Sequence, residues 1–311
     1  MMHAAPVTHT PTYFHQPWEQ DKAAPFIDQS LAKAVARSYA KELLNEWDHY
    51  EQRTRRSIGR NDTPNRKVKN HRQLRERQSL LDKLLGNLIP VSSAFINGNS
   101  KCASVSLGLR PDKPIQSPHA HYSLQVYAWV LLMPGYLHKI ETPMRISLHA
   151  VERVIQRSGL VDLPIRKADM QAINAEFADM LPLAALAIDV MKHYANQTSD
   201  EQAHALTLLL PSAHGLFVGN WCPELGSLLI KTFIDAKKFN SAQTQAVHEL
   251  KAVTDIDLAP ILVDALIPRW FQTNKALAYD KITQAWQHFA WRFDIDRLHP
   301  GMSDAAWQQS N

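Results

Sequence analysis

Glycine is scarce in this chain, and its scarcity excludes several classes of enzyme. Only 10 of the 311 residues are glycine. The sequence has no phosphate loop ending in Gly-Lys-Ser/Thr and no Gly-x-Gly-x-x-Gly dinucleotide fingerprint. It also lacks the Gly-x-Ser-x-Gly elbow that presents the nucleophile of many hydrolases. We therefore set aside nucleotide-dependent enzymes and serine hydrolases of that type, and we predict no cofactor.

Cysteine and long apolar runs are also missing. The two cysteines, Cys102 and Cys222, are far apart and match no paired-ligand spacing, which is typical of buried thiols in a reducing compartment. No run of 18 or more apolar residues occurs. Residues 1–18 lack the basic start and apolar stretch of a secretion signal. We therefore expect a cytoplasmic protein that has no membrane partner.

Metal binding has one weak indication in the sequence. His119 and His121 form a His-x-His pair, which on a strand would direct both rings to the same face. Cys102, His214 and Cys222 could join them, because histidine and cysteine suit zinc. The chain has 15 histidines, so such pairs also arise by chance. We therefore predict no metal site.

Hydrophobic periodicity predicts an α+β fold with N-terminal helices, an antiparallel sheet preceded by a helix bearing His and Arg, and C-terminal helices. The predicted helices span residues 28–55, 69–88, 147–157, 167–194 with a break near Pro182, and 241–293. The predicted strands span residues 102–109, 122–133, 136–140, 205–210, 215–221 and 227–234. For residues 122–133 a buried helix is the alternative.

These elements predict four regions along the chain. Residues 1–25 contain Pro and His without periodicity, which indicates an irregular arm. Residues 26–95 form a helical region that includes a basic segment, and residues 96–240 form an α+β body. Residues 241–311 form a helical C-terminal region. A soft boundary is therefore expected near residue 95.

Positive charge is concentrated in one part of the sequence. The net charge is +4, yet residues 53–77 contain ten Lys or Arg against two acids, so the rest of the chain is net negative. These ten cations are Arg53, Arg55, Arg56, Arg60, Arg66, Lys67, Lys69, Arg72, Arg75 and Arg77. Such a segment gains salt-sensitive, largely sequence-independent affinity for the phosphates of nucleic acid. It contains no aromatic residue, so base stacking is not predicted. A solvated charged loop and a site for an acidic protein partner are the alternatives.

A second set of charged residues lies on the helix predicted at residues 147–157. His149, Arg153 and Arg157 recur at four-residue intervals, which places them on one side of a helix, here called the His/Arg face. Cleavage of RNA without a metal needs groups that transfer protons and cations that surround the phosphorus. Histidine titrates near neutrality, and arginine forks bind phosphate oxygens in pairs. We predict His149 as general base or acid, and Arg153 and Arg157 as phosphate clamps. A solvated helix face paired with Glu152 and Asp162 is the alternative.

The string from His149 to Arg157 resembles the His-Ala-x-x-Arg-x-x-x-Arg helix of small RelE-like ribonuclease-fold domains of bacterial toxins. Residues 215–219 and 229–234 look similar to the later strands of that family. The resemblance covers about residues 145–235, and it implies a helix before an antiparallel sheet whose face gathers the catalytic residues. It also implies that Lys231 adds charge to the site and that Thr232 donates a hydrogen bond to phosphate. Ordinary alternation on an edge strand is the alternative for both residues.

Two functions from different classes follow from these patterns. The first is a metal-independent endoribonuclease, associated with a toxin, a defence system or a mobile element, that uses the His/Arg face. The second is a non-catalytic nucleic-acid-binding protein that uses residues 53–77. RNA is favoured over DNA as the partner, and a protein partner is an additional expectation. A structural or regulatory protein with neither activity is a third reading.

Overall fold

The computed structural model describes most of the chain between residues 27 and 254. The described residues are 27–58, 67–85, 94–97, 101–112, 123–158, 167–195, 207–222, 226–254, 263–264, 266–267 and 270. The arm predicted at residues 1–25, the histidines at 119 and 121, and most of the predicted C-terminal helical region lie outside them. Arg60 and Arg66 of the basic segment lie outside them as well, as do the side chains of Arg55 and Arg56.

The described strands form one seven-stranded sheet with the order β1-β2-β3-β4-β7-β6-β5. Their bounds are β1 (Ala94–Asn97), β2 (Cys102–Pro111), β3 (Ser123–Met133), β4 (Leu137–Ser147), β5 (Thr207–Pro211), β6 (Gly215–Cys222) and β7 (Ser227–Asp235). Neighbouring strands are antiparallel except for β4 and β7, which pair in parallel from Met144 with Leu228 to Ile146 with Ile230. The α+β class predicted from the sequence is confirmed, and the sheet is mixed.

The parallel pair follows from the path of the chain. After β4 the chain passes through two helices before it begins the meander β5-β6-β7, and the last strand of that meander lies beside β4. A parallel neighbour requires such a long crossover, whereas antiparallel neighbours need only a turn. The His/Arg helix therefore precedes only the second half of the sheet and follows the first half.

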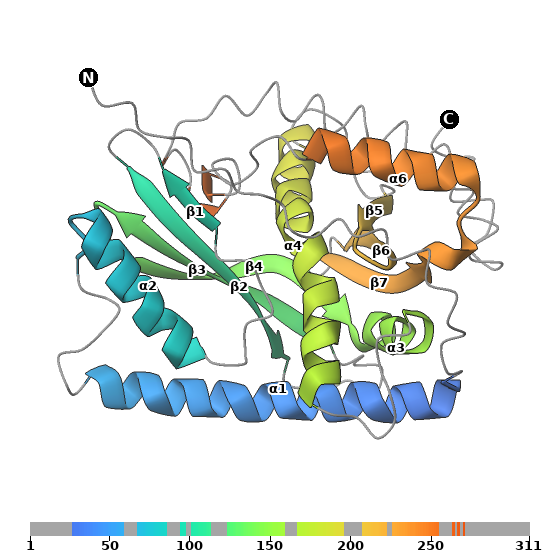
Figure 1. The fold of residues 1–311 in the computed structure, drawn as a ribbon, viewed down its shortest axis with the longest axis horizontal. Helices are drawn as coiled ribbons and strands as arrows, with labels where there is room; N and C mark the ends of the chain where they lie inside the picture. The colour runs from blue at the N-terminus through green and yellow to red at the C-terminus, as the bar shows by residue number, and fades with distance from the viewer. Residues whose placement is uncertain are drawn as a thin grey trace.

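The helices pack around this sheet (Figure 1). They are α1 (Gln29–Ile58), α2 (His71–Leu85), α3 (Leu148–Arg157), α4 (Lys167–Ala195) and α6 (Ser241–Thr254), with a short 3-10 turn, η4 (Ala236–Lys238). Helix α1 extends along one whole side of the molecule and contacts α2, α3 and β2. Its first turn is capped by Asp28, whose Oδ1 accepts a hydrogen bond from the Leu31 N–H at 2.9 Å. Helix α2 lies over β2 and β3.

The break predicted near Pro182 is absent, because α4 continues through that residue. A proline inside a helix removes one backbone hydrogen bond and crowds the preceding turn. Here the surrounding turns are held in the core, since Phe177, Met180, Leu181 and Ala184 are all fully buried. Tertiary burial outweighs the local cost at this position.

One large hydrophobic cluster joins the N-terminal helix to the rest of the protein. It contains Val35 and Tyr39 of α1, Val130 of β3, Phe177 of α4 and Phe217 of β6. The regions expected at residues 26–95 and 96–240 therefore share a core across the boundary expected near residue 95. Within the described residues, no helix has the length and apolar character needed to cross a bilayer.

Candidate nucleic-acid interface

Helix α2 is held on the sheet by one buried face. Leu74, Leu81 and Leu85 are buried on this face, together with the polar residue Gln78. The Gln78 Oε1 accepts a hydrogen bond from Ser104 Oγ at 2.6 Å, and its Nε2 donates to Ser106 Oγ at 3.2 Å. A buried amide with satisfied donors and acceptors fixes the rotation of the helix. The charged residues of α2 are consequently directed away from the sheet.

The opposite side of α2 and the segment before it carry exposed cations. Lys67, Lys69, Arg72 and Arg75 are exposed, and we call these four residues the α2 basic face. The Arg72 side chain is 89% exposed, and its Nε lies 2.8 Å from Glu76 Oε1. An exposed pair of this kind is loosely held and screened by salt. These guanidinium and ammonium groups are therefore accessible to phosphate oxygens.

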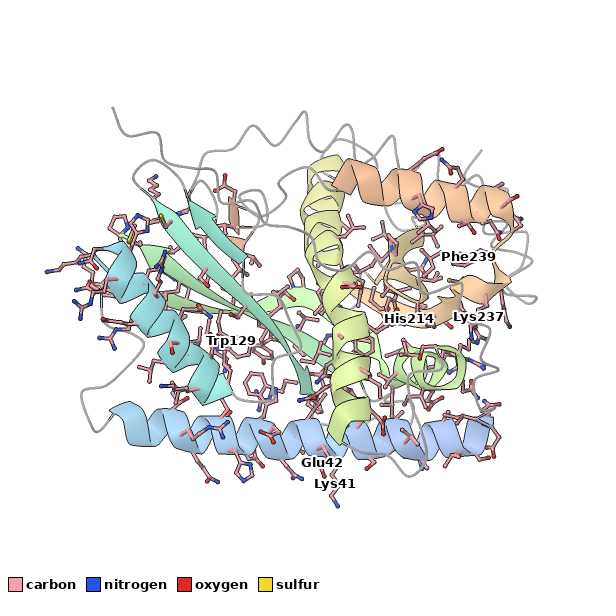
Figure 2. All side chains as sticks on the ribbon, viewed as in Figure 1. Lys41, Glu42, Trp129, His214, Lys237 and Phe239 are labelled. Atoms are coloured by element: carbon pink, nitrogen blue, oxygen red, sulfur yellow. The ribbon has the colours of Figure 1, made fainter. Side chains whose placement is uncertain are left out.

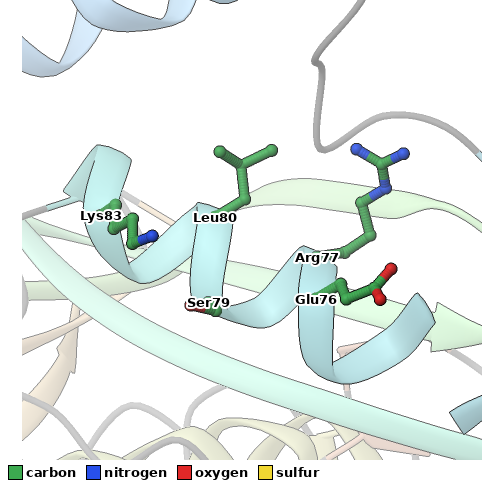
Figure 3. Close-up of a pocket in the computed structure, with 5 residues that line it drawn as sticks. All are labelled: Glu76, Arg77, Ser79, Leu80 and Lys83. Carbon is green, nitrogen blue, oxygen red and sulfur yellow. The ribbon is translucent and has the colours of Figure 1, made fainter. Parts of the chain in front are cut away.

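A surface hollow of about 270 Å³ lies along the same helix. It is lined by Glu76, Arg77, Ser79, Leu80 and Lys83 (Figure 3). The side chains of Arg77 and Leu80 extend from the same side of the helix. Two cations and one apolar side chain thus border a concave part of the surface next to the α2 basic face.

Arg53, the first cation of the predicted segment, is used inside the protein. Its Nε donates a hydrogen bond to the carbonyl oxygen of Leu84 at 3.0 Å, near the C-terminal end of α2. The last carbonyls of a helix have no partner within the helix, and a guanidinium satisfies them and complements the helix dipole. Arg53 therefore joins α1 to α2 and does not belong to the exposed set.

Helix α3 begins where the sequence predicted it. Ser147 is its N-cap, since its Oγ accepts from the Ala150 N–H at 3.1 Å. The same Oγ donates to the Lys231 carbonyl oxygen at 3.0 Å. Beyond Ile230, β7 has no paired residue on β4, and α3 packs there instead. Ser147 therefore caps a helix and a free edge of the sheet with one hydroxyl group.

Two members of the His/Arg face, His149 and Arg153, contact each other. His149 is 47% exposed, and its Nε2 accepts a hydrogen bond from Arg153 Nε at 3.2 Å. Its Nδ1 lies 3.4 Å from Glu152 Oε2. Arg153 Nη1 also donates to Gln156 Oε1 at 2.7 Å. The lone pair that a general base would use is therefore occupied by a neighbouring guanidinium.

Arg157 is directed at the protein rather than at solvent. Its Nη1 donates to the Phe233 carbonyl oxygen at 2.6 Å, on the same free edge of β7 that Ser147 caps. Carbonyls two residues apart on a strand point to the same edge, which explains why Lys231 and Phe233 both need partners here. Burial, with the nearby Arg153 charge, lowers the pKa of Arg157, and Asp235 opposes that shift. Arg157, predicted as a phosphate clamp, thus binds a backbone carbonyl at the edge of the sheet.

The two residues added by the resemblance do not meet at one surface. Lys231 is exposed and Thr232 is buried, at 4% exposure, because consecutive residues of a strand point to opposite faces. Ser147 contacts Lys231 only through its backbone. The structure therefore brings His149 and Arg153 together, attaches Arg157 to β7, and separates Lys231 from Thr232.

A buried ion pair near this helix had no clear signal in the sequence. Glu176 of α4 is 1% exposed, and its Oε2 lies 2.7 Å from Nδ1 of His214, in the turn between β5 and β6. Glu176 Oε1 accepts from the His214 N–H at 3.0 Å and from the Ser212 hydroxyl. The hydrogen bond to Glu176 raises the pKa of His214 despite its partial burial, with Asp179 and Asp235 adding to the shift. The pair fastens the turn, whose His214 is labelled in Figure 2, to α4.

A second group of side chains, which the sequence analysis did not predict, lies between α1 and the sheet. Trp47 of α1 and Tyr127 of β3 lie beside two cations, Arg110 of β2 and Lys139 of β4. Tyr127 and Trp129 share one side of a strand, and this alternation was the available signal. Sequence alone does not reveal that Lys139 and Arg110 lie over the same rings.

The described residues contain no cluster of three or more side chains suited to hold a metal ion. Cys102 Sγ lies 3.7 Å from His71 Nδ1, which is a contact between two elements and not a ligand set. Comparison of the chain with protein-family models, curated proteins and solved structures gives no match. The RelE-like resemblance therefore stays a prediction, and function is argued from the geometry.

Proposed function

We propose that the protein binds nucleic acid through the α2 basic face. The observation that carries this proposal is the exposure of four cations, Lys67, Lys69, Arg72 and Arg75. The hydrogen bonds of Gln78 to the sheet hold α2 in the orientation that exposes them. A rigid element that presents several cations to solvent can neutralise several phosphates at once. Each such contact releases counterions, which gives affinity that depends strongly on salt and weakly on sequence.

The test compares two variants that remove equal charge from two helices. One variant carries Lys69→Gln, Arg72→Gln and Arg75→Gln on the α2 side. The control carries Lys33→Gln, Arg37→Gln and Lys41→Gln, three exposed cations of α1. Lys41 points away from the sheet in Figure 2. Both variants lose the same net charge, so any difference between them reports position.

Binding is measured by fluorescence anisotropy with labelled RNA and DNA oligonucleotides over a range of salt concentrations. We expect the α2 variant to bind roughly tenfold more weakly or worse, with the slope of log affinity against log salt reduced by about 2. The α1 control should retain most of the affinity. Equal losses in the two variants would mean that only net charge matters, and a wild-type protein that binds neither RNA nor DNA would refute the proposal.

The predicted endoribonuclease activity is a second proposal, supported by the exposure of the His149 imidazole, which would have to exchange its hydrogen bond from Arg153 for one from the RNA 2′-hydroxyl. Purified protein should then cleave RNA in the presence of EDTA and leave 2′,3′-cyclic phosphate ends. His149→Ala should abolish cleavage, whereas His138→Ala, which changes an exposed histidine of β4, should not. Cleavage by His149→Ala at the wild-type rate, or no cleavage by the wild type, would refute this activity.

A further inference from the structure

Four aromatic side chains form a cluster where α1 meets the sheet. Trp47 and Tyr50 come from α1, and Tyr127 and Trp129 come from β3. The Trp47 ring stacks on Trp129 with centroids 5.6 Å apart and lies 5.1 Å from the Tyr127 ring. Trp47, Tyr50 and Trp129 are buried, while Tyr127 is half-buried at the rim. The cluster is a rigid aromatic floor with one ring that reaches the surface.

Two cations lie over this floor. Lys139 Nζ is 4.7 Å from the ring centroid of Trp47, 5.7 Å from that of Tyr50 and 5.1 Å from that of Tyr127. The Arg110 guanidinium carbon lies 5.3 Å from the centroid of Trp47. Ring faces attract cations, so the aromatic floor holds both side chains near one another. We call Arg110, Lys139 and Tyr127 the aromatic-cation site.

The site brings two cations together beside two carboxylates: Glu141 Oε2 accepts a hydrogen bond from the Tyr127 hydroxyl at 3.2 Å, and Glu51 lies near Arg110. Among the described residues, none provides a carboxylate oxygen within 4.0 Å of Lys139 Nζ, and the Arg110 pair with Glu51 is long, at 4.0 Å. Burial, followed by the charge of Arg110, lowers the pKa of Lys139, although Glu51 and Glu141 oppose the shift. An anion bound between the two cations would relieve their mutual repulsion.

The aromatic-cation site adjoins helix α2. Leu81, Leu84 and Leu85 belong to the same hydrophobic cluster as Trp47 and Trp129, and Leu80 packs against its edge. Leu80 also lines the surface hollow, together with Arg77 and Lys83. Leu80 therefore borders both the surface hollow, with its two cations, and the aromatic cluster beneath Lys139 and Arg110.

We propose that the nucleic acid bound by this protein is single-stranded, and that its backbone passes from α2 to Arg110 and Lys139 while a base stacks on Tyr127. This inference rests on the proposed nucleic-acid binding and adds the class of ligand. Sequence-independent binding of single strands combines cations that follow the backbone with rings on which bases stack. A base paired in a duplex has both faces covered, so Tyr127 can be used only by an unpaired base.

The experiment measures affinity for a labelled single strand and for the duplex of the same sequence, as both RNA and DNA. The single strand should bind at least about fivefold more tightly than the duplex. Tyr127→Leu, which removes the stacking ring, should weaken binding of the single strand at least about fivefold. Tyr127→Phe keeps the ring and loses only the hydroxyl that donates to Glu141, so it should bind more tightly than Tyr127→Leu. Lys139→Gln should reduce the salt slope for the single strand by about 0.7.

The outcomes separate this inference from the proposed function. If the α2 variant loses binding while Tyr127→Leu and Lys139→Gln bind normally, the aromatic-cation site is refuted and binding through α2 stands. Equal wild-type affinity for single strand and duplex refutes the inference in the same way. If the wild type binds no nucleic acid, both proposals fail. If inorganic phosphate binds the wild-type protein at Lys139 as tightly as the oligonucleotide does, the site is one for a free anion. The inference of a bound single strand is then refuted.

Circular dichroism and the urea unfolding midpoint establish that each variant is folded. Lys41→Gln provides the matched control for Lys139→Gln, because it removes one exposed lysine from the outer side of α1. This control should leave both affinity and salt slope close to the wild-type values. A slope change in Lys41→Gln equal to that in Lys139→Gln would show a general charge effect and refute a localised contact.

Discussion

Helices α2 and α3 both carry cations at helical spacing, yet the surroundings of those cations differ. The cations of the α2 basic face are exposed, and Arg72 has only an exposed pair with Glu76. The cations of α3 are bonded to the protein itself: Arg157 to the Phe233 carbonyl, and Arg153 to His149 and Gln156. Spacing in a sequence predicts which residues share a face, while the neighbouring elements decide whether that face is available.

The difference has a topological cause. Helix α2 covers β2 and β3, and each of these strands is paired on both edges. The side chains of α2 therefore face no strand edge with unpaired backbone groups. Helix α3 lies beside the part of β7 that β4 leaves unpaired, and Ser147 and Arg157 supply donors to its carbonyls. Unpaired backbone groups must find partners in a folded protein. The α3 side of the molecule therefore uses its polar side chains for stability.

Among the described residues on the α3 side, the largest effect is expected at Glu176. Glu176→Ala should lower the free energy of unfolding by about 3 kcal/mol, because it leaves His214 and Ser212 without their buried acceptor. Glu176→Gln keeps an acceptor oxygen and should lose less. Urea unfolding measures both variants. A loss below about 1 kcal/mol for Glu176→Ala would contradict the role of this pair in fastening the turn.

Arg157 is expected to have the next largest effect. Arg157→Ala should cost about 2 kcal/mol of unfolding free energy, since the Phe233 carbonyl loses a charged donor. Arg157→Met keeps an aliphatic chain, so the difference between the two variants separates packing from hydrogen bonding. Arg75→Ala on α2 is the control and should change the free energy by no more than about 0.5 kcal/mol. Equal effects at the two arginines would remove the contrast between the helices.

The sequence predicted the local elements well, because they depend on local patterns. The ranges predicted at residues 28–55, 102–109 and 147–157 correspond to α1, β2 and α3. The prediction of β4 stopped at residue 140, although the strand continues to Ser147. In residues 141–147 buried positions alternate with less buried ones, and these residues pair with β3 and β7. The parallel pairing with β7, which is distant in sequence, has no local signal.

The candidate site was predictable only in part for the same reason. The basic segment is contiguous, so composition was enough to find the α2 basic face. The aromatic-cation site combines residues of β2, β3 and β4 beside Trp47 of α1, and it exists only when the sheet is assembled. Contacts such as Arg157 with Phe233 depend on which strand lies beside α3. The availability of a charged side chain is therefore a tertiary property.

The pH dependence of stability gives a further contrast between the two sides. The hydrogen bond that the His214 ring donates to Glu176 raises the pKa of His214 in the folded state. A raised pKa stabilises the fold fully below the unfolded value of about 6.5, and this contribution is lost as pH rises through the folded pKa. Wild-type protein should therefore lose its stability advantage over His214→Gln as pH increases from about 5.5 to 9. A stability difference that stays constant or grows over this range, measured by urea unfolding, would contradict the assignment.

The smallest effect is expected from the charges that we assign to nucleic-acid binding. The variant with Lys69→Gln, Arg72→Gln and Arg75→Gln should unfold at the wild-type urea midpoint, because these side chains are exposed and the pair of Arg72 with Glu76 is screened by solvent. The same variant should lose affinity for oligonucleotides. A charged residue that contributes to binding but not to stability is one that is available to contact a partner. If the midpoint falls as it does for Arg157→Ala, the α2 cations support the fold, and the two helices do not differ in the way that the binding proposal requires.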